Sequence, residues 1–421
     1  MMHRSMLAVL VLALFGLFSG ERVVAAPPDS GVRIYLITIG PGDEVWEQFG
    51  HNAIEIVDPS RKYSDVACNW GVFDNFEKGF YTRFIFGRML YRMEMDGDAQ
   101  KMIEYYRQSN RSVYRQELNL TESQKAALQD YVYWNAQPEN QNYRYDYYRD
   151  NCSTRARDVI DRSVGGELAA QLKPKKTGVT YRWHTRRIMA SDLPMYTSLL
   201  FILGHPVDRP ISAWEDSFLP LRLMDYLRHV TVVDDLGNRV PIVKSEEVLF
   251  KATREAQRAK PPNWVVPFFV LGLLCAGIFW VLGKWAVRSR LGRGIFLTVA
   301  AIWGIFIGGA GTFALWGWMC TEHVAVYWNE NILHFFPPAI LLGILIPVAA
   351  KYPTRRTITV IRWLAIGVAV CSVFGLLIKV LPWFRQVNYE LIAWVLPTHL
   401  AFAWGICKVY QLRKNDISSV A

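Results

Sequence analysis

The hydrophobic positions divide the chain into a mixed segment and a mostly apolar one. Residues 27–260 alternate short hydrophobic runs with polar stretches, as an ordinary globular domain does, whereas residues 264–408 are largely apolar with charges gathered in short clusters. A helix of about 20 apolar residues is long enough to cross a bilayer, so we expect a membrane domain of about five transmembrane helices in residues 261–421.

A shorter apolar run at the N-terminus predicts a signal peptide. The run covers residues 6–18, follows His3 and Arg4, and is succeeded by small residues up to Ala26. A run of this length that leads to an A-x-A-like site is typical of a cleaved secretion signal rather than of a spanning helix. We assign residues 1–26 to it, and an uncleaved run would leave the following domain on the same side of the membrane.

Basic residues separate or follow the predicted spans in three clusters. These are Lys284, Arg288, Arg290 and Arg293; Lys351, Arg355 and Arg356; and Lys408, Arg413 and Lys414. The positive-inside rule places all three clusters, and the C-terminus, in the cytoplasm. Residues 27–260 and the connections at 320–331 and 382–390 then lie in the periplasm of a bacterial inner membrane. This placement explains the net charge of +10 without nucleic acid as a partner.

Two further basic stretches, at residues 173–176 and 182–187, lie in the exported domain. Either they form a solvated face or they are attracted to anionic lipid headgroups.

Residues 27–260 combine strand and helix patterns, which favours an α+β fold. Residues 32–38, 53–57 and 65–72 have the alternation or apolar runs of strands. If the second and third of these strands pair in antiparallel fashion, His51 and Asn69 come close to each other.

Helical spacing follows at residues 100–109 and 121–135, the latter opened by a capping box of Thr121 and Gln124. Helical spacing begins again at Ser153 and ends in a glycine pair. Cys152 is therefore predicted at, or just before, a helix N-terminus.

Cys152 is the candidate nucleophile of the exported domain. A helix N-terminus and a neighbouring imidazole both lower the pKa of a thiol, and His51 supplies the imidazole if the fold brings it back to Cys152. The alternative is a disulfide between Cys152 and Cys68, because both residues belong to the exported domain. The other cysteines in apolar runs are expected to be small hydrophobes: Cys275, Cys371 and Cys407.

The periplasmic connection near residues 320–334 is unusually polar and aromatic. Either it is an interfacial belt of aromatic residues, or His323 and Asn329 line the access route for a substrate between the two domains. His399 lies in a predicted span, where an ionisable side chain faces other helices or a cavity.

Four motifs carry a resemblance to a known family. F-G-H-N-A-I-E-I, N-W-G-V-F-D, Q-E-L-N-L-T and Y-R-Y-D-Y-Y-R-D-N-C-S-T-R-A-R-D resemble the N-terminal periplasmic domain of Lnb-type bacterial lipoprotein N-acyltransferases. The likeness covers roughly residues 32–230 and is weaker at T-E-H-V-A-V-Y-W-N-E-N in the membrane half. The order of His, polar residue and Asn-Cys is also similar to circularly permuted papain-like folds, as in the lecithin–retinol acyltransferase group and permuted relatives of NlpC peptidases.

The resemblance implies an acyltransferase with such a permuted papain-like domain in front of a helical membrane bundle. Its donor is a membrane phospholipid, and its acceptor is the α-amino group of the diacylglyceryl-cysteine of a lipoprotein. Cys152 is implied as the nucleophile that forms a thioester, and His51 as the general base and then acid. Asn69 either orients His51 or only caps a turn. Asn151 and the amides of Ser153 and Thr154 are implied as support for the oxyanion.

Two other classes of function remain open at this point. One is a membrane-tethered cysteine hydrolase, such as a peptidase, amidase or lipase, because the same thiol site supports hydrolysis and transfer. The other is a non-catalytic binding protein with a Cys68–Cys152 disulfide. No metal site is expected, since the histidines lack ligand spacing and no C-x-x-C pair is present. The chain also lacks a phosphate loop and a dinucleotide fingerprint, so no cofactor is expected.

Overall fold

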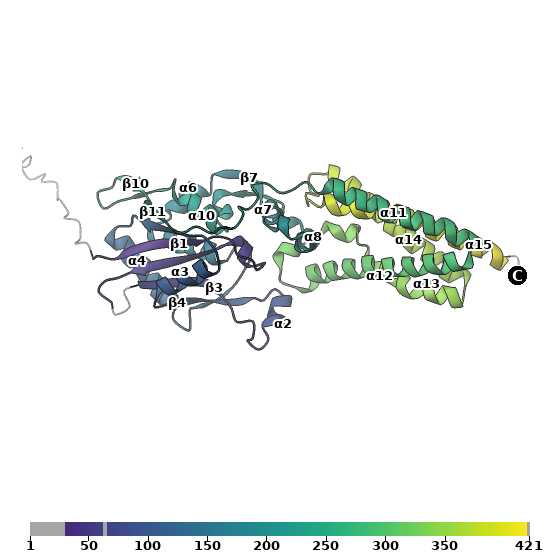
Figure 1. Cartoon of the computed structure of the whole chain (residues 1–421), viewed down its shortest axis with the longest axis horizontal. Coiled ribbons are helices and arrows are strands. Elements are labelled where there is room, and N and C mark those ends of the chain that lie inside the picture. Colours follow the sequence, from purple (N-terminus) through teal and green to yellow (C-terminus); the bar gives the residue numbers. More distant parts are fainter. Residues whose placement is uncertain (1–29, 62–64, 419–421) are drawn as a thin grey trace, which may run out of the picture.

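The computed structural model describes residues 30–61 and 65–418 and consists of two parts along one long axis: a sheet domain and a helical bundle (Figure 1). The predicted signal peptide lies outside the described residues. The observed class is α+β followed by a helical bundle, as the hydrophobic pattern predicts.

A seven-stranded antiparallel sheet forms the centre of the first part, in the strand order β11-β5-β1-β2-β3-β4-β6. Its strands are β1 (Arg33–Ile39), β2 (His51–Val57), β3 (Asp65–Val72), β4 (Leu90–Asp96), β5 (Val113–Leu118), β6 (Asn142–Arg144) and β11 (Val243–Phe250). The three predicted strands correspond to β1, β2 and β3. β2 and β3 pair in antiparallel fashion with Ala53 opposite Asn69, as expected.

Helices cover both faces of this sheet because successive strand residues point to opposite sides. On one face, Leu36 and Ile54 pack in a core with Val132 and Ile160, while on the other Ile37 packs with residues of a separate cluster. The first face is covered by α4 (Glu122–Asn135), α5 (Cys152–Ser163) and α10 (Pro220–Leu227), and the second by α3 (Ala99–Gln108). The capping box of Thr121 and Gln124 is present at α4, as predicted.

Shorter elements connect these layers to the bundle. They are η1 (Glu47–Phe49), α2 (Phe80–Ile85), α6 (Glu167–Leu172), β7 (Lys176–Thr180), α7 (Tyr181–Ile188), η2 (Met189–Ser191), α8 (Leu193–Ile202), η3 (His205–Val207), β8 (Pro210–Ser212), α9 (Ala213–Asp216), β9 (Thr231–Val233) and β10 (Arg239–Pro241). In Figure 1, α7 and α8 lie at the end of the sheet domain that faces the bundle.

The bundle contains four helices that are long and apolar enough to cross a membrane, within the described residues. These are α11 (Val265–Arg288), α12 (Arg290–Cys320), α14 (Arg355–Leu377) and α15 (Tyr389–Ser418). Short 3-10 turns connect them: η4 (Val324–Val326), η5 (Glu330–Leu333) and η7 (Ile378–Val380).

The third of the expected spans is instead a shorter apolar helix, Pro337–Lys351. It starts as the 3-10 turn η6 (Pro337–Leu341) and continues as α13 (Leu342–Lys351). Its chain lies directly against two glycines of α12: a Cβ at Gly308 would stand 2.0 Å from the Ile340 nitrogen, and one at Gly311 only 1.6 Å from the Phe335 oxygen. The predicted number of about five spans therefore becomes four long helices and one short one in the part described.

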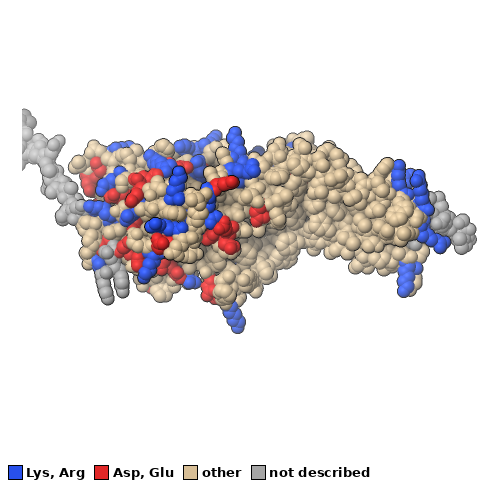
Figure 2. Space-filling view, in the orientation of Figure 1, with Lys and Arg blue, Asp and Glu red and all other residues tan. Residues whose placement is uncertain are grey.

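Charged residues are concentrated at the two ends of the bundle and not along its middle. Figure 2 shows Lys and Arg at the end far from the sheet domain, and a surface almost without charged residues between that end and the charged sheet domain. This banding is typical of a membrane protein, because charges are costly in the hydrocarbon core.

Polar side chains of the bundle join it to helix α8. The last four carbonyls of a helix lack partners inside it. Here Asn331 Nδ2 donates to the carbonyls of Leu200 and Phe201, at 3.2 and 2.9 Å. Asn329 Nδ2 donates to the carbonyls of Phe201 and Ile202, at 2.9 and 3.0 Å. Side chains of the bundle thus cap α8 and join the bundle to the sheet domain.

Candidate active site

Cys152 is the first residue of helix α5, as the sequence predicts. Asn151 Oδ1 accepts hydrogen bonds from the amides of Ser153 and Thr154, at 3.0 and 2.9 Å. The Thr154 hydroxyl accepts in turn from the Asn151 amide at 2.8 Å, which completes a capping box. The thiol therefore lies at the positive end of a helix whose start is tightly held.

The sheet brings His51 close to this thiol. The register of β2 and β3 confirms the predicted approach of the second and third strands. His51 opens β2, and its Nε2 lies 3.0 Å from Asn69 Oδ1 on β3. The imidazole is also close enough to Cys152 for the two groups to shift each other's pKa. Since Nε2 faces Asn69, Nδ1 is the nitrogen left for the sulfur. Asn69 Nδ2 reaches 3.4 Å to the Asp96 carboxylate, a residue that the sequence did not single out.

The two titratable groups shift each other's pKa in opposite directions. Burial by itself would raise the pKa of Cys152, but the charge and hydrogen bond of His51, with the amides of Asn52 and Ser153, bring the pKa below its ordinary value. Burial would lower the pKa of His51, but the Cys152 thiolate and Asn69 raise it above its ordinary value. Both shifts are in the direction of a thiolate beside an imidazolium, the reactive form of a cysteine nucleophile.

Aromatic side chains enclose the thiol. Gly71 has φ of +86°, and a Cβ there would lie 3.5 Å from the Tyr145 ring and 3.8 Å from Cys152 Cβ. Tyr143 lies on the same side, with its hydroxyl 3.8 Å from that position. Tyr106 lies beside His51 with a ring separation of 6.3 Å, and burial raises its pKa to about 12. Tyr106 is therefore neutral, and the tyrosines place aromatic rings beside the half-buried Cys152.

Cys68 and Cys152 are both free thiols, so the proposed disulfide is wrong for this fold. Cys68 is fully buried in the core with Ile54 and Trp70. Gly71 is the β3 residue next to Cys152, and it lies three residues from Cys68, or about 10 Å along a strand. A disulfide needs Cα atoms within about 7 Å, so Cys68 is too far from Cys152 to form one.

The residues expected to support an oxyanion are engaged in the helix cap. The amides of Ser153 and Thr154 both donate to Asn151, and Asn151 Nδ2 donates to the carbonyls of Tyr147 and Phe218, each at 3.0 Å. An oxyanion role for them stays a prediction, and Asn151 could take it only if the cap opened. The Asn52 amide, which contacts the Cys152 sulfur, is a backbone donor that the sequence pattern did not reveal.

The two residues expected to line substrate access lie in different environments. His323 stacks on Tyr147 with a ring separation of 6.1 Å, and its Nε2 lies 2.8 Å from the Phe84 carbonyl. It is thus close to the aromatic enclosure. Asn329 is only 2% exposed and caps α8, so an access role is wrong for this side chain. His399 is fully buried in the bundle, where Nδ1 lies 2.9 Å from the Ser372 hydroxyl.

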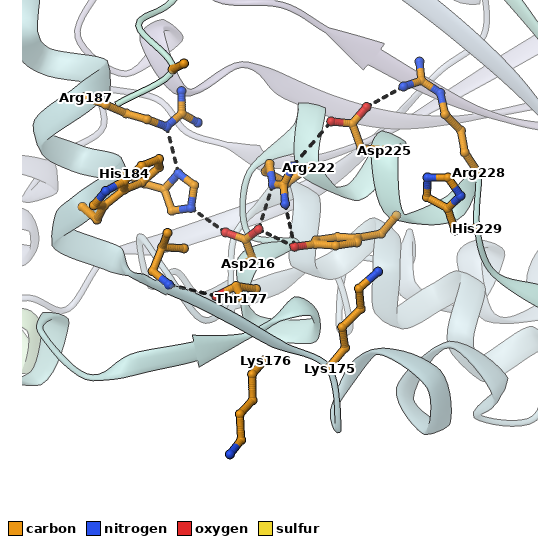
Figure 3. Close-up of a pocket in the computed structure, with 14 residues that line it drawn as sticks. Lys175, Lys176, Thr177, His184, Arg187, Asp216, Arg222, Asp225, Arg228 and His229 are labelled. Carbon is orange, nitrogen blue, oxygen red and sulfur yellow. Dashed lines mark hydrogen bonds and ion pairs between the residues drawn. The ribbon is translucent and has the colours of Figure 1, made fainter. Parts of the chain in front are cut away.

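A second cluster of charged groups lies in a cavity of about 710 Å³ between β7, α7 and α10 (Figure 3). At its base Asp216 is fully buried and binds His184, Arg222 and the Tyr226 hydroxyl. Burial holds the pKa of His184 below its ordinary value, and its Nδ1 accepts from Arg187 at 3.0 Å. The Nε2 side of this ring faces the Asp216 carboxylate.

The segment that follows Asp216 contacts the start of α5, where Cys152 lies. The two residues after Asp216 offer their carbonyls to the start of α5: Ser217 to the Ser153 hydroxyl at 2.7 Å, and Phe218 to Asn151. The contacts link segments some 60 residues apart, so no local pattern could have predicted them. Among the described residues, no group of three or more side chains could hold a metal ion.

Comparison with known proteins supports the resemblance noted in the sequence. Residues 26–191 match the family model described as the Lnb N-terminal periplasmic domain. The matched segment contains His51, Asn69 and Cys152. This match and the four membrane-capable helices together indicate a membrane protein with a periplasmic domain. Neither the curated proteins nor the solved structures give a match to this chain.

Proposed function

We propose that this chain, whose exported part is an Lnb-type periplasmic domain, is a lipoprotein N-acyltransferase of the bacterial inner membrane. It transfers a fatty acyl chain from a phospholipid to the α-amino group of the diacylglyceryl-cysteine of a lipoprotein. The observation that carries the proposal is the placement of Cys152 at the start of α5, close to His51, which is oriented by Asn69.

The first step makes an acyl-enzyme. The Cys152 thiolate attacks the carbonyl carbon of a phospholipid ester, so that a C–S bond forms and the ester C–O bond breaks. The His51 imidazolium gives its proton to the departing glycerol oxygen. The products are a Cys152 thioester and a lysophospholipid.

The second step transfers the chain to the amine. The α-amino nitrogen of the lipoprotein attacks the thioester carbonyl, and a C–N bond forms while the C–S bond breaks. Neutral His51 accepts the proton that the amine loses, and Cys152 returns to the thiolate. A deprotonated His51 is thus needed for this step and a protonated one for the first.

The order of these groups supports a permuted papain-like arrangement, in which His51 and Asn69 on neighbouring strands precede a cysteine at a helix start. The basic clusters support a cytoplasmic position for the far end of the bundle and a periplasmic one for the sheet domain. Both substrates are lipids of the membrane that holds the enzyme, so tethering raises their effective concentration.

A membrane-tethered cysteine hydrolase is the second candidate, because water could replace the amine in the second step. The rings of Tyr143 and Tyr145 near Cys152 support transfer, since an aromatic lining suits an acyl chain better than water. The non-catalytic alternative loses its basis, since the thiols of Cys68 and Cys152 are free.

Mass spectrometry of a model lipoprotein tests the proposal. In a host depleted of its own N-acyltransferase, the wild-type chain is expected to add one amide-linked acyl chain to the N-terminal peptide, and Cys152→Ala or His51→Ala to add none. Cys68→Ala is the matched control, because it removes the other thiol of the sheet domain and leaves the site intact. A lipoprotein that stays diacylated with wild type, or full activity of Cys152→Ala, would overturn the proposal.

A further inference from the structure

The segment between β3 and β4, residues 73–90, exposes more large apolar side chains than a water-facing segment normally does. We call it the aromatic arm; it contains the short helix α2. Phe76 is 93% exposed, Tyr81 65% and Ile85 51%. Such a cluster on a soluble surface marks a place of contact with a partner or a membrane.

The arm contacts the bundle where a spanning helix leaves the membrane. The Glu322 amide donates to the Phe86 carbonyl at 2.8 Å, directly after the end of α12. The Phe86 ring lies 5.7 Å from that of Trp316, which is about one turn before the end of α12. A second tie is the ion pair of Arg88 with Glu322 at 2.7 Å.

These contacts fix the depth of the arm. Trp316 belongs to the apolar helix Arg290–Cys320, and tryptophan at a helix end is typical of the interface between hydrocarbon and headgroups. In Figure 1, α2 projects from the sheet domain on the side that faces the bundle, near α12. The exposed side chains of the arm therefore lie near the end of α12 that faces the sheet domain.

A row of stacked rings leads from the arm to the nucleophile. The Phe80 ring lies 5.6 Å from Phe73, and Phe73 lies 4.9 Å from Tyr91. Tyr91 stacks on Tyr145 at 4.4 Å. Tyr145 in turn borders Gly71, beside Cys152.

We propose that the aromatic arm inserts into the outer leaflet and that its ring row guides a phospholipid acyl chain to Cys152. The exposed arm residues supply the membrane contact, and the stacked rings supply an apolar path from that contact to the thiol. The guidance of an acyl donor rests on the proposed acyltransferase function, whereas insertion of the arm does not.

Photo-cross-linking tests the insertion. Benzoylphenylalanine is placed at Phe76 or, as the control, at Trp134, an exposed aromatic residue (54%) on α4 in the sheet domain. Full-length protein in vesicles of phosphatidylethanolamine and phosphatidylglycerol is irradiated and analysed for lipid adducts. Adducts are expected at position 76 and not at position 134. Equal labelling at both positions, or none at position 76, would overturn the insertion.

A donor comparison tests the guidance. In the double variant Phe76→Ser/Ile85→Ser, formation of the Cys152 thioester from vesicle phospholipid is expected to fall about tenfold or more, because two apolar membrane contacts are lost. Acylation by water-soluble p-nitrophenyl acetate is expected to stay within about twofold of wild type, which shows that the site is folded. Trp134→Ser is expected to change neither rate.

The cross-linking and the donor comparison together separate the two proposals. If wild type forms no thioester from phospholipid, the acyltransferase function and the guidance fail together, and cross-linking still decides whether the arm enters the membrane. If wild type forms the thioester and the double variant forms it equally fast from vesicles, the guidance alone is wrong. An equal loss with both donors would also contradict the guidance, because it would locate the defect at the thiol.

Discussion

His51 Nε2 faces Asn69 Oδ1 at 3.0 Å across the β2–β3 pair, and Asp96 determines which way round the amide lies. The Asp96 carboxylate is placed to accept from Asn69 Nδ2, at 3.4 Å, so the amide oxygen points to the imidazole. An oxygen can only accept here, and therefore Nε2 carries the proton. His51 is held with Nδ1 toward Cys152, in the orientation that general acid–base catalysis requires.

Asn69→Ala is expected to lower the rate of acyl transfer by about tenfold to a hundredfold, since a misplaced imidazole costs about that much. Because Asn69 is a positioning residue, the loss should be accompanied by a higher apparent pKa in the pH profile of Cys152 alkylation. Asp96→Asn should give a smaller loss in the same direction. A slower rate with an unchanged alkylation profile would assign Asn69 a purely structural role.

Alkylation of Cys152 by iodoacetamide should show the lowered pKa of the thiol. The thiolate is the reacting form, so a pKa held down by the charge of His51 moves the rise in rate to lower pH than for an ordinary cysteine. His51→Ala removes that charge and should move the rise back to higher pH. Mass spectrometry of the Cys152 peptide measures both rates; identical profiles would contradict the ion pair.

The two half-reactions should differ in their dependence on pH. Thioester formation needs the imidazolium, which the raised pKa of His51 preserves to higher pH than usual, and it should fall as pH rises through that pKa. Aminolysis needs neutral His51 and should rise with pH over a lower range, because the acylated Cys152 no longer carries the charge that raises the pKa of His51. Single-turnover measurements of the acyl-enzyme, with and without acceptor, separate the two; parallel profiles would exclude His51 as the shared acid and base.

Asp216→Asn is expected to lower the free energy of unfolding by about 3 kcal/mol, because it leaves Arg222 without its buried partner. The Ser217 and Phe218 carbonyls should then hold the start of α5 less firmly, and alkylation of Cys152 should slow. Asp225→Asn, on the more exposed rim of the same cavity, is the control and should have little effect. Denaturant titration of the detergent-solubilised chain measures the stability.

Asn331→Ala should weaken the junction between sheet domain and bundle. It removes one donor from each of two α8 carbonyls, which keep Arg182 and Asn329 as their other donors, and it leaves the buried Asn388 amide without its acceptor at 2.6 Å, at a cost of about 1 to 2 kcal/mol. The expected result is a lower unfolding midpoint in detergent and faster proteolysis near α8. Ser198→Ala on the exposed side of α8 is the control, and equal behaviour of the two variants would refute the capping role.

The sequence predicted those parts of the structure that depend on local periodicity. β1, β2 and β3, the capping box of α4 and the position of Cys152 at a helix start all follow from patterns within about ten residues. The approach of His51 to Asn69 followed because neighbouring strands pair in antiparallel fashion.

The remaining features depend on contacts between distant segments. Asn329 looked like a substrate residue because it lies in a polar connection, but its amide is used by carbonyls of α8 far back in the chain. The segment before the short third helix lies against Gly308 and Gly311 of α12, a contact that hydropathy does not reveal. The sequence did not predict a role for Asp216, because its partners come from other elements, α7 and α10.

The burial of Cys68 has a consequence for oxidative chemistry in the periplasm. The sheet domain contains one other cysteine, and that one is the proposed nucleophile. Once a reactive thiolate is oxidised to sulfenic acid, a nearby second thiol normally resolves it as a disulfide. Cys68 is shut in the core and cannot serve, so an oxidised Cys152 depends on an external reductant or thiol for its repair.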